Sequence, residues 1–96
     1  MKMVVIAYNE ALDSEVMKLL KTHGQSTYTK WTKVLGQGER SEPHLLTHIW
    51  PKANNVIMIC TEDNKAIAIM TAVREARNAY SHEGIKAFSM PLDDVT

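Results

Sequence analysis

The chain has 96 residues, the size of one domain, and its 45% hydrophobic content is ordinary for a globular protein. Eleven basic residues balance eleven acidic ones without a long run of like charge, which argues against nucleic-acid binding and polybasic membrane-surface binding. A single cysteine and the lack of a signal-peptide or transmembrane pattern lead us to expect one cytoplasmic domain over residues 1–96, with no membrane insertion.

The first third of the chain predicts a strand, a helix and a second strand. Met3–Tyr8 is a continuous apolar run rich in β-branched residues, which is typical of a buried strand. Asn9 or Asp13 can cap the following helix, and Gly24 can end it in the left-handed conformation. The β-prone residues of Thr27–Val34 predict the next strand. The apolar positions that share one face of the helix are Leu12, Val16, Leu19 and Leu20.

The middle of the chain predicts a loop followed by strands. Residues 35–43 are rich in glycine, serine and charge, which indicates a loop. His44–Trp50 is a second strand-like run, interrupted by Pro51. Val56–Cys60 is apolar throughout, so we expect it at the centre of a sheet.

The last third predicts a long helix and a final strand. The hydroxyl of Thr61 can cap a helix that runs to about Tyr80. Gly84 breaks the helical pattern, Ile85–Met90 predicts a last strand, and the acidic tail after it is expected to be loose. The expected buried stripe of the helix consists of Ala66, Ile69, Met70, Val73, Ala76 and Tyr80.

This order of elements predicts an α+β fold of the ferredoxin-like β-α-β-β-α-β type, with an antiparallel four-stranded sheet and both helices on one face. The strands at 3–8 and 56–60 are apolar on both faces, whereas a sheet with one wet face should alternate apolar and polar residues. We therefore expect the chain to oligomerise through the face that the helices leave open. The alternative is that the termini or the loop fold over that face.

Catalytic motifs are not recognisable in the sequence, which has no nucleophile elbow, Walker loop, zinc-protease helix or dinucleotide fingerprint, so we expect no enzyme. Cys60 lies within an apolar run without a neighbouring cation, which favours a core thiol over a nucleophile.

The turn Gly36–Gln37–Gly38 together with Arg40 is the best candidate for an anion or ligand site. Glycine lets backbone N–H groups approach an anion, and arginine supplies a bidentate positive charge. Lys52 can reach the same cleft. The alternatives are a plain flexible loop and an ordinary solvent-exposed lysine.

His44 and His48 raise the possibility of a metal site. In a strand, four residues span about 13 Å, which is too far for two imidazoles to share one ion. Chelation would need a residue of a second subunit, such as His82 or Cys60. The alternative is that these histidines simply lie on the sheet surface.

Three segments of the chain resemble the PII signalling proteins, the trimeric nitrogen regulators, and their PII-like relatives. Thr29–Gly38 is similar to the second strand of that family and its Gly-x-Gly entry into the T-loop. Trp50–Pro51–Lys52 looks like the Leu-Pro-Lys before the third strand, and Glu83–Gly84 looks like the Asp-Gly before the last strand. The resemblance implies a homotrimer with its open sheet faces around an axis and a nucleotide site in each cleft between subunits.

The same comparison shows where this chain departs from the family pattern. The Gly-rich phosphate loop of the family is degenerate here, because residues 79–85 keep only Gly84, and Ile85 stands where the family lysine would be. Lys86 follows one position later and is expected on the other face of the strand. The T-loop is short and has no tyrosine between Gly36 and Pro43.

Three functions are consistent with these observations. The first is a PII-like regulatory homotrimer that binds a nucleotide or other anion between subunits, with Gly84 and Lys86 joining the loop residues, and that signals to a protein target. The second is a metal-responsive module that uses His44, His48 or His82 across subunits. The third is a structural or adaptor trimer without a small ligand. The cofactor is left unassigned.

Overall fold

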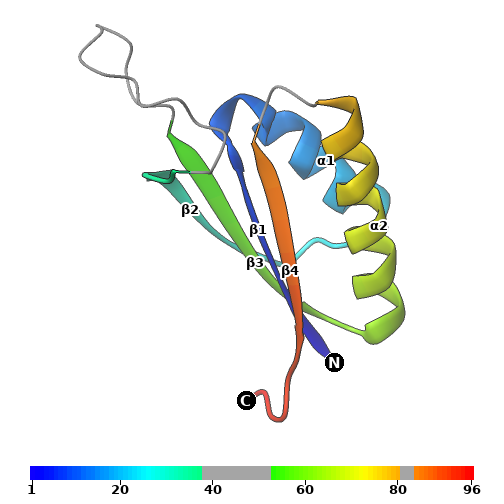
Figure 1. Ribbon diagram of the computed structural model, residues 1–96. Coiled ribbons are helices and arrows are strands. Elements are labelled where there is room, and N and C mark those ends of the chain that lie inside the picture. The colour runs from blue at the N-terminus through cyan, green and yellow to red at the C-terminus, as the bar shows by residue number, and fades with distance from the viewer. Residues whose placement is uncertain (38–52, 81–83) are drawn as a thin grey trace, which may run out of the picture.

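The computed structural model describes residues 1–37, 53–80 and 84–96. Within them the elements follow the predicted order of strand, helix, strand, strand, helix and strand (Figure 1). Their bounds are β1 Lys2–Asn9, a short 3₁₀ helix Glu10–Leu12, α1 Asp13–Thr22, β2 Thr29–Val34, β3 Asn54–Thr61, α2 Asp63–Ala79 and β4 Ile85–Pro91. The strand-like run predicted at 44–50 and most of the loop predicted at 35–43 lie outside the described residues.

The four strands form one sheet in the order β2-β3-β1-β4, and every neighbouring pair is antiparallel. Both helices pack on the same face of this sheet, as the ferredoxin-like arrangement requires (Figure 1). The predicted fold class is therefore confirmed.

The core lies between the helices and one face of the sheet. Alternate residues of β1 and β3 point into it, because side chains of a strand alternate between faces. The buried side chains are Val4, Ile6, Tyr8, Leu12, Val16, Leu20, Ile57, Ile59, Ala66, Ile69, Val73 and Ile85. Tyr80 was predicted in this stripe but is exposed, because α2 ends at Ala79 and the backbone of Tyr80 leaves the helical conformation.

Helix starts follow the sequence prediction in one case and depart from it in the other. The Asn9 side chain accepts a hydrogen bond from the backbone N–H of Ala11 at 2.9 Å, which caps the 3₁₀ helix before α1. Thr61 was predicted to cap α2, but it is the last residue of β3. Glu62 occupies the capping position without a side-chain hydrogen bond.

The second face of the sheet carries no helix. Met3, Val5 and Ala7 of β1 point to this face, and the strand register places mostly apolar residues beside them, with Lys86 as the charged exception. Trp31 and Phe88 are both 47% exposed. We call this surface the open face; it consists of Met3, Val5, Ala7, Thr29, Trp31, Val56, Met58, Cys60, Lys86, Phe88 and Met90.

Cys60 corrects the sequence prediction of a core thiol. Its thiol is exposed, because Ile57 and Ile59 take the helix-facing positions of β3 and the next residue must point the other way.

Among the described residues, no helix is both long enough and apolar enough to cross a membrane.

Candidate functional site

The candidate site lies where β1 and β2 end and β3 and β4 begin. Asn9 pairs with Asn54 across the central strands, and Val34 of β2 also pairs with Asn54. The backbone N–H of Asn9 donates to the carbonyl oxygen of Gly84 at 2.8 Å. We call this edge, formed by residues 34–37, Asn9, Asn54 and Gly84, the loop end of the sheet.

Gly36 and Gln37 are the two residues of the predicted anion turn that the structure describes. Gly36 lies directly against Asn54, since a Cβ atom at this glycine would come within 2.5 Å of the Asn54 Nδ2 atom. A larger residue at this position would have to push aside the end of the flexible Asn54 side chain. Gly38, Arg40 and Lys52 lie outside the described residues.

Gly84 and Lys86 lie at the other edge of the same sheet end. Because β3 and β1 separate β2 from β4, residues on the two edges are about 14 Å apart at the usual strand spacing. Within one chain, no small anion can touch both Gly36 and Gly84. The structure thus brings the predicted residues to one end of the sheet but divides them into two groups.

Ile85 and Lys86 point to opposite faces of β4, as the sequence predicted. Ile85 is buried under the helices, and Lys86 lies on the open face opposite Ala7. The Lys86 ammonium nitrogen is 5.6 Å from the centroid of the Phe88 ring, which is cation–π range. Lys86 therefore offers its charge to the open face and not to the core.

A polar network on the helix side supports the loop end, and sequence analysis did not predict it. Asp13, the first residue of α1, accepts hydrogen bonds from the Tyr8 hydroxyl at 2.6 Å and from the Asn55 amide at 3.1 Å. The Lys30 ammonium nitrogen lies 2.8 Å from one Asp13 carboxylate oxygen and 3.0 Å from the other. The network ties β1, α1, β2 and β3 together, with Tyr8 and Asn55 one residue from the loop end and Lys30 joining from the first half of β2.

The electrostatics of this network hold Asp13 ionised and Tyr8 neutral. Burial alone would raise the pKa of the Asp13 carboxyl, but the hydrogen bonds from Lys30, Tyr8 and Asn55 outweigh it and lower the pKa below the usual value. Burial, followed by the hydrogen bond to Asp13, raises the pKa of the Tyr8 phenol well above its ordinary value. Lys30 is consequently paired internally and is a poor candidate for binding an external anion.

The only sequence signal for this network was weak. Tyr8 and Asn55 place polar groups on strand faces that are otherwise apolar, and Asp13 stands at a helix start. A buried hydroxyl and a buried amide both need a partner. That requirement predicts a partner of some kind, but the identity of the partner depends on how the strands and α1 pack.

A β-bulge shapes the end of β2. Trp31 pairs with Val56 and Val34 pairs with Asn54, so β2 has one residue more than β3 over this stretch. Lys33 takes up the extra residue with a φ of 58°, an uncommon conformation for a residue other than glycine. Bulges bend a strand and redirect its side chains, and this one lies just before Gly36.

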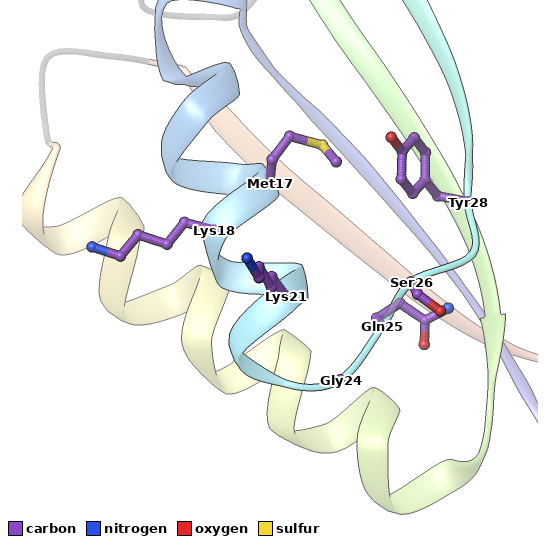
Figure 2. Close-up of a pocket in the computed structure, with 7 residues that line it drawn as sticks. All are labelled: Met17, Lys18, Lys21, Gly24, Gln25, Ser26 and Tyr28. Carbon is purple, nitrogen blue, oxygen red and sulfur yellow. The ribbon is translucent and has the colours of Figure 1, made fainter.

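A groove between α1 and β2 lies on the helix side, away from the open face. Its volume is about 660 Å³, and Met17 and Tyr28 point into the space between helix and strand (Figure 2). The ammonium group of Lys18 points away from it (Figure 2). Its lining residues are Met17, Lys18, Lys21, Gly24, Gln25, Ser26 and Tyr28. None of them was predicted as a site residue.

The predicted metal alternative is not tested by the described residues. His44, His48 and His82 all lie outside them. Within residues 1–37, 53–80 and 84–96, no group of three or more histidine, cysteine, aspartate or glutamate side chains could hold a metal ion.

Comparison with known proteins gives one family and one fold. The family model described as nitrogen regulatory protein P-II matches residues 1–96. A search of curated proteins finds no significant match. Several solved structures match this chain over nearly its whole length. Each is less than 25% identical to it, so these matches support the fold and nothing further.

One of them, CPII from Thiomonas intermedia K12 bound to ADP and bicarbonate, is 18% identical with a TM-score of 0.69, and the match covers 97% of this chain and 88% of that one. The apo form of CPII is 14% identical with a TM-score of 0.66, covering 95% of this chain and 89% of that one. A protein from Thermus thermophilus described as PII-like is 20% identical with a TM-score of 0.68, covering 93% of this chain and 83% of that one.

Proposed function

The chain belongs to the nitrogen regulatory protein P-II family, a family of regulatory proteins, and on this premise we propose a specific mode of action for it. It forms a homotrimer through its open face and binds a small anionic ligand in the clefts between subunits. The ligand class we propose is an adenine nucleotide, alone or together with a small anion such as bicarbonate. We expect it to act in the cytoplasm.

The observation that carries this proposal is the division of the candidate site. Gly36 and Gln37 follow β2, whereas Gly84 and Lys86 belong to the β4 edge, about 14 Å away. A ring of subunits places one edge of each chain beside the other edge of its neighbour. A cleft between two subunits would then combine the loop turn of one chain with Gly84 and Lys86 of the next.

The open face supports self-association. Phe88 and Trp31 are half-exposed aromatic rings, and between them β1 presents Met3, Val5 and Ala7. Burying apolar surface contributes about 25 cal/mol per Å², so a second copy with the same surface is a favourable cover. The number three comes from the family resemblance.

The ligand class is supported by related structures and by the cations in this chain. Structures of CPII contain ADP and bicarbonate, and others contain ADP, AMP and bicarbonate. In this chain the phosphate loop keeps only Gly84, so it has few positions where the backbone can approach a phosphate as closely as glycine allows. We therefore assign the charge recognition to Lys86 and to Arg40 and Lys52 of the loop region.

Binding is expected to act on the segment that follows Gly36. In our proposal, residues 35–43 form a shortened T-loop that changes conformation with the ligand and contacts a protein target. The bulge at Lys33 and the Gly36–Asn54 approach set the direction in which this segment leaves the sheet.

Isothermal calorimetry with ADP, AMP and ATP, each with and without bicarbonate, tests the ligand. Lys86→Gln should weaken binding about tenfold or more, since a charged hydrogen bond contributes about 1.5–3 kcal/mol. Lys18→Gln is the matched control, because its ammonium group lies on the helix side. No heat with any ligand, or equal affinities in both variants, would overturn the proposal.

Mixed trimers test whether the site lies between subunits. Arg40→Ala and Lys86→Gln chains should each bind poorly alone. When they are unfolded together and refolded as an equal mixture, about one quarter of the clefts should combine two intact halves and recover normal affinity. If no cleft in the mixed trimers regains normal affinity, Arg40 and Lys86 of the same chain form the site, and the proposal is contradicted.

A further inference from the structure

The side-chain amide of Asn54 lies against the backbone of the turn that follows β2. A Cβ atom added to Gly36 would come within 2.5 Å of the Asn54 Nδ2 atom and 3.8 Å of its Cγ atom. Because Gly36 has no side chain, the Asn54 amide rests directly on its main chain. The Asn54 amide is therefore placed to determine where the backbone of Gly36 lies.

The backbone that carries Asn54 is held on both sides. On one side, the carbonyl oxygen of Ala53 accepts a hydrogen bond from the backbone N–H of Glu10 at 3.1 Å. On the other side, the Asn55 amide donates to the Asp13 carboxylate at 3.1 Å. Asn54 itself is the first residue of β3. Its main chain is thus a fixed support for the amide that it carries.

The turn has no comparable support of its own. Gly36 and Gln37 belong to no helix or strand, and β2 ends before them at Val34, which pairs with Asn54. When a hydrogen-bonded strand touches a segment without regular structure, the strand is the more rigid partner and sets the position of the segment. A change at Asn54 should therefore move or loosen the turn, while β3 stays in place.

This support matters for the anion site because the turn would meet a ligand through its backbone N–H groups. Such groups bind an anion together only when they point to one position, since hydrogen bonds weaken steeply away from their preferred geometry. The Asn54 amide acts on the turn from within the same chain and does not need to be exposed. The contact is therefore independent of whether other subunits cover the open face.

We propose that Asn54 is the positioning residue of the ligand site, and that its amide holds the backbone of Gly36 and Gln37 where it meets the phosphate groups of an adenine nucleotide. Asn54 acts through the turn and does not itself contact the ligand. This role rests on the proposed nucleotide site, and it assigns the residue that fixes one half of that site.

The competing explanation is that Asn54 only fills space beside the turn, and two complementary substitutions distinguish the two roles. Gly36→Ala adds a methyl group that must push the Asn54 amide aside, whereas Asn54→Ala removes the amide. Gly36 does not have a positive φ, so alanine is not strained there. In the double variant, the new methyl group enters the space that the amide has vacated, and the turn regains a neighbour.

The matched control is Asn64→Ala. Asn64 is exposed and lies in the first turn of α2, which starts at the opposite end of the sheet from the loop end (Figure 1). The same asparagine-to-alanine change there should affect neither the turn nor the ligand.

Calorimetry with ADP on the full chain measures the effect on binding. Asn54→Ala and Gly36→Ala should each weaken ADP binding about fivefold or more, and the double variant should bind more tightly than either single variant. Asn64→Ala should bind like the parent protein. Urea denaturation of each variant gives the stability, and affinity losses that simply follow the urea midpoints would indicate space filling and overturn the positioning role.

Nuclear magnetic resonance relaxation tests the same role without a ligand. The backbone N–H groups of Gly36 and Gln37 should have lower order parameters in Asn54→Ala than in the parent protein, and unchanged ones in Asn64→Ala. A parent protein that binds no ADP would overturn the proposed nucleotide site and, with it, the ligand role of Asn54.

Three results would overturn the positioning role while leaving the nucleotide site intact. The first is equal ADP affinity in the parent protein and Asn54→Ala. The second is a double variant that binds ADP no more tightly than the single variants. The third is unchanged order parameters of Gly36 and Gln37 in Asn54→Ala.

Discussion

Removing the carboxylate of Asp13 is expected to destabilise the protein more than any other single surface-accessible change in α1. In the structure it accepts hydrogen bonds from the Tyr8 hydroxyl and the Asn55 amide, and both of these residues are at least nine-tenths buried. Asp13→Ala leaves two buried donors without an acceptor, at about 1–3 kcal/mol each. The ion pair with Lys30 adds about 0–1 kcal/mol, because that side chain is partly exposed.

These terms set the expected size of the effect. The Asp13 side chain keeps 36% of its surface exposed, so water can enter part of the vacated space and satisfy one donor. We therefore expect a loss of about 2–4 kcal/mol in the free energy of unfolding. Urea denaturation followed by circular dichroism measures it, at one fixed protein concentration because self-association would add to the apparent stability.

Two controls make this prediction specific. Glu15→Ala removes an exposed carboxylate two residues along the same helix, whose partner is the neighbouring Ser14 hydroxyl, and it should change stability by less than about 0.5 kcal/mol. Tyr8→Phe should cost clearly less in the Asp13→Ala background than in the parent, with a coupling of about 1–2 kcal/mol. Additive effects of the two changes, or a loss below about 0.5 kcal/mol for Asp13→Ala, would refute the reasoning.

The same residue predicts how stability depends on acid. The pKa of Asp13 is lower in the folded protein than in the unfolded chain. Its contribution is therefore complete above the unfolded value of about 3.9 and is lost as pH falls through the lower folded value. The stability gap between the parent and Asp13→Ala should narrow below about pH 4. A gap that stays constant down to pH 2 would contradict this assignment.

Three further predictions test other parts of the structure. Phe88→Glu on the open face should convert the oligomer into monomers in light scattering, whereas Ile67→Glu on the exposed face of α2 should not; an unchanged mass for both would argue against this interface. The Tyr8 phenol, with its raised pKa, should stay protonated above pH 10 while the fold persists, so ultraviolet titration should leave one of the three tyrosines unionised until unfolding. Gly24 has a φ of 70° and Lys33 a φ of 58°, a conformation that favours glycine. In urea denaturation, Gly24→Ala should lower the free energy of unfolding by about 1 kcal/mol, and Lys33→Gly should raise it by a similar amount. Changes of the opposite sign would exclude backbone strain as the cause.

The sequence by itself determined the fold and the apolar character of the open face. A strand, a helix and a strand are predicted before the loop at residues 35–43, and the same three elements are predicted after it. Few chain topologies are compatible with this order of elements. A strand that is apolar at every position must be covered on both faces, so the open face was predictable without knowing which strands are neighbours. These features follow from the local periodicity of apolar residues, which can be read directly from the sequence.

Only the tertiary structure decided which residues meet. Cys60 changed from a core thiol to an exposed one because the strand register, and not its apolar neighbours, sets the face to which it points. Gly36 and Gly84 looked like parts of one phosphate site, but two intervening strands keep them apart in one chain. Asp13 looked like a simple helix cap, yet it is the acceptor shared by Tyr8, Lys30 and Asn55. Each of these outcomes depends on strand pairing and helix packing between residues far apart in the chain, and local sequence patterns carry little information about such pairings.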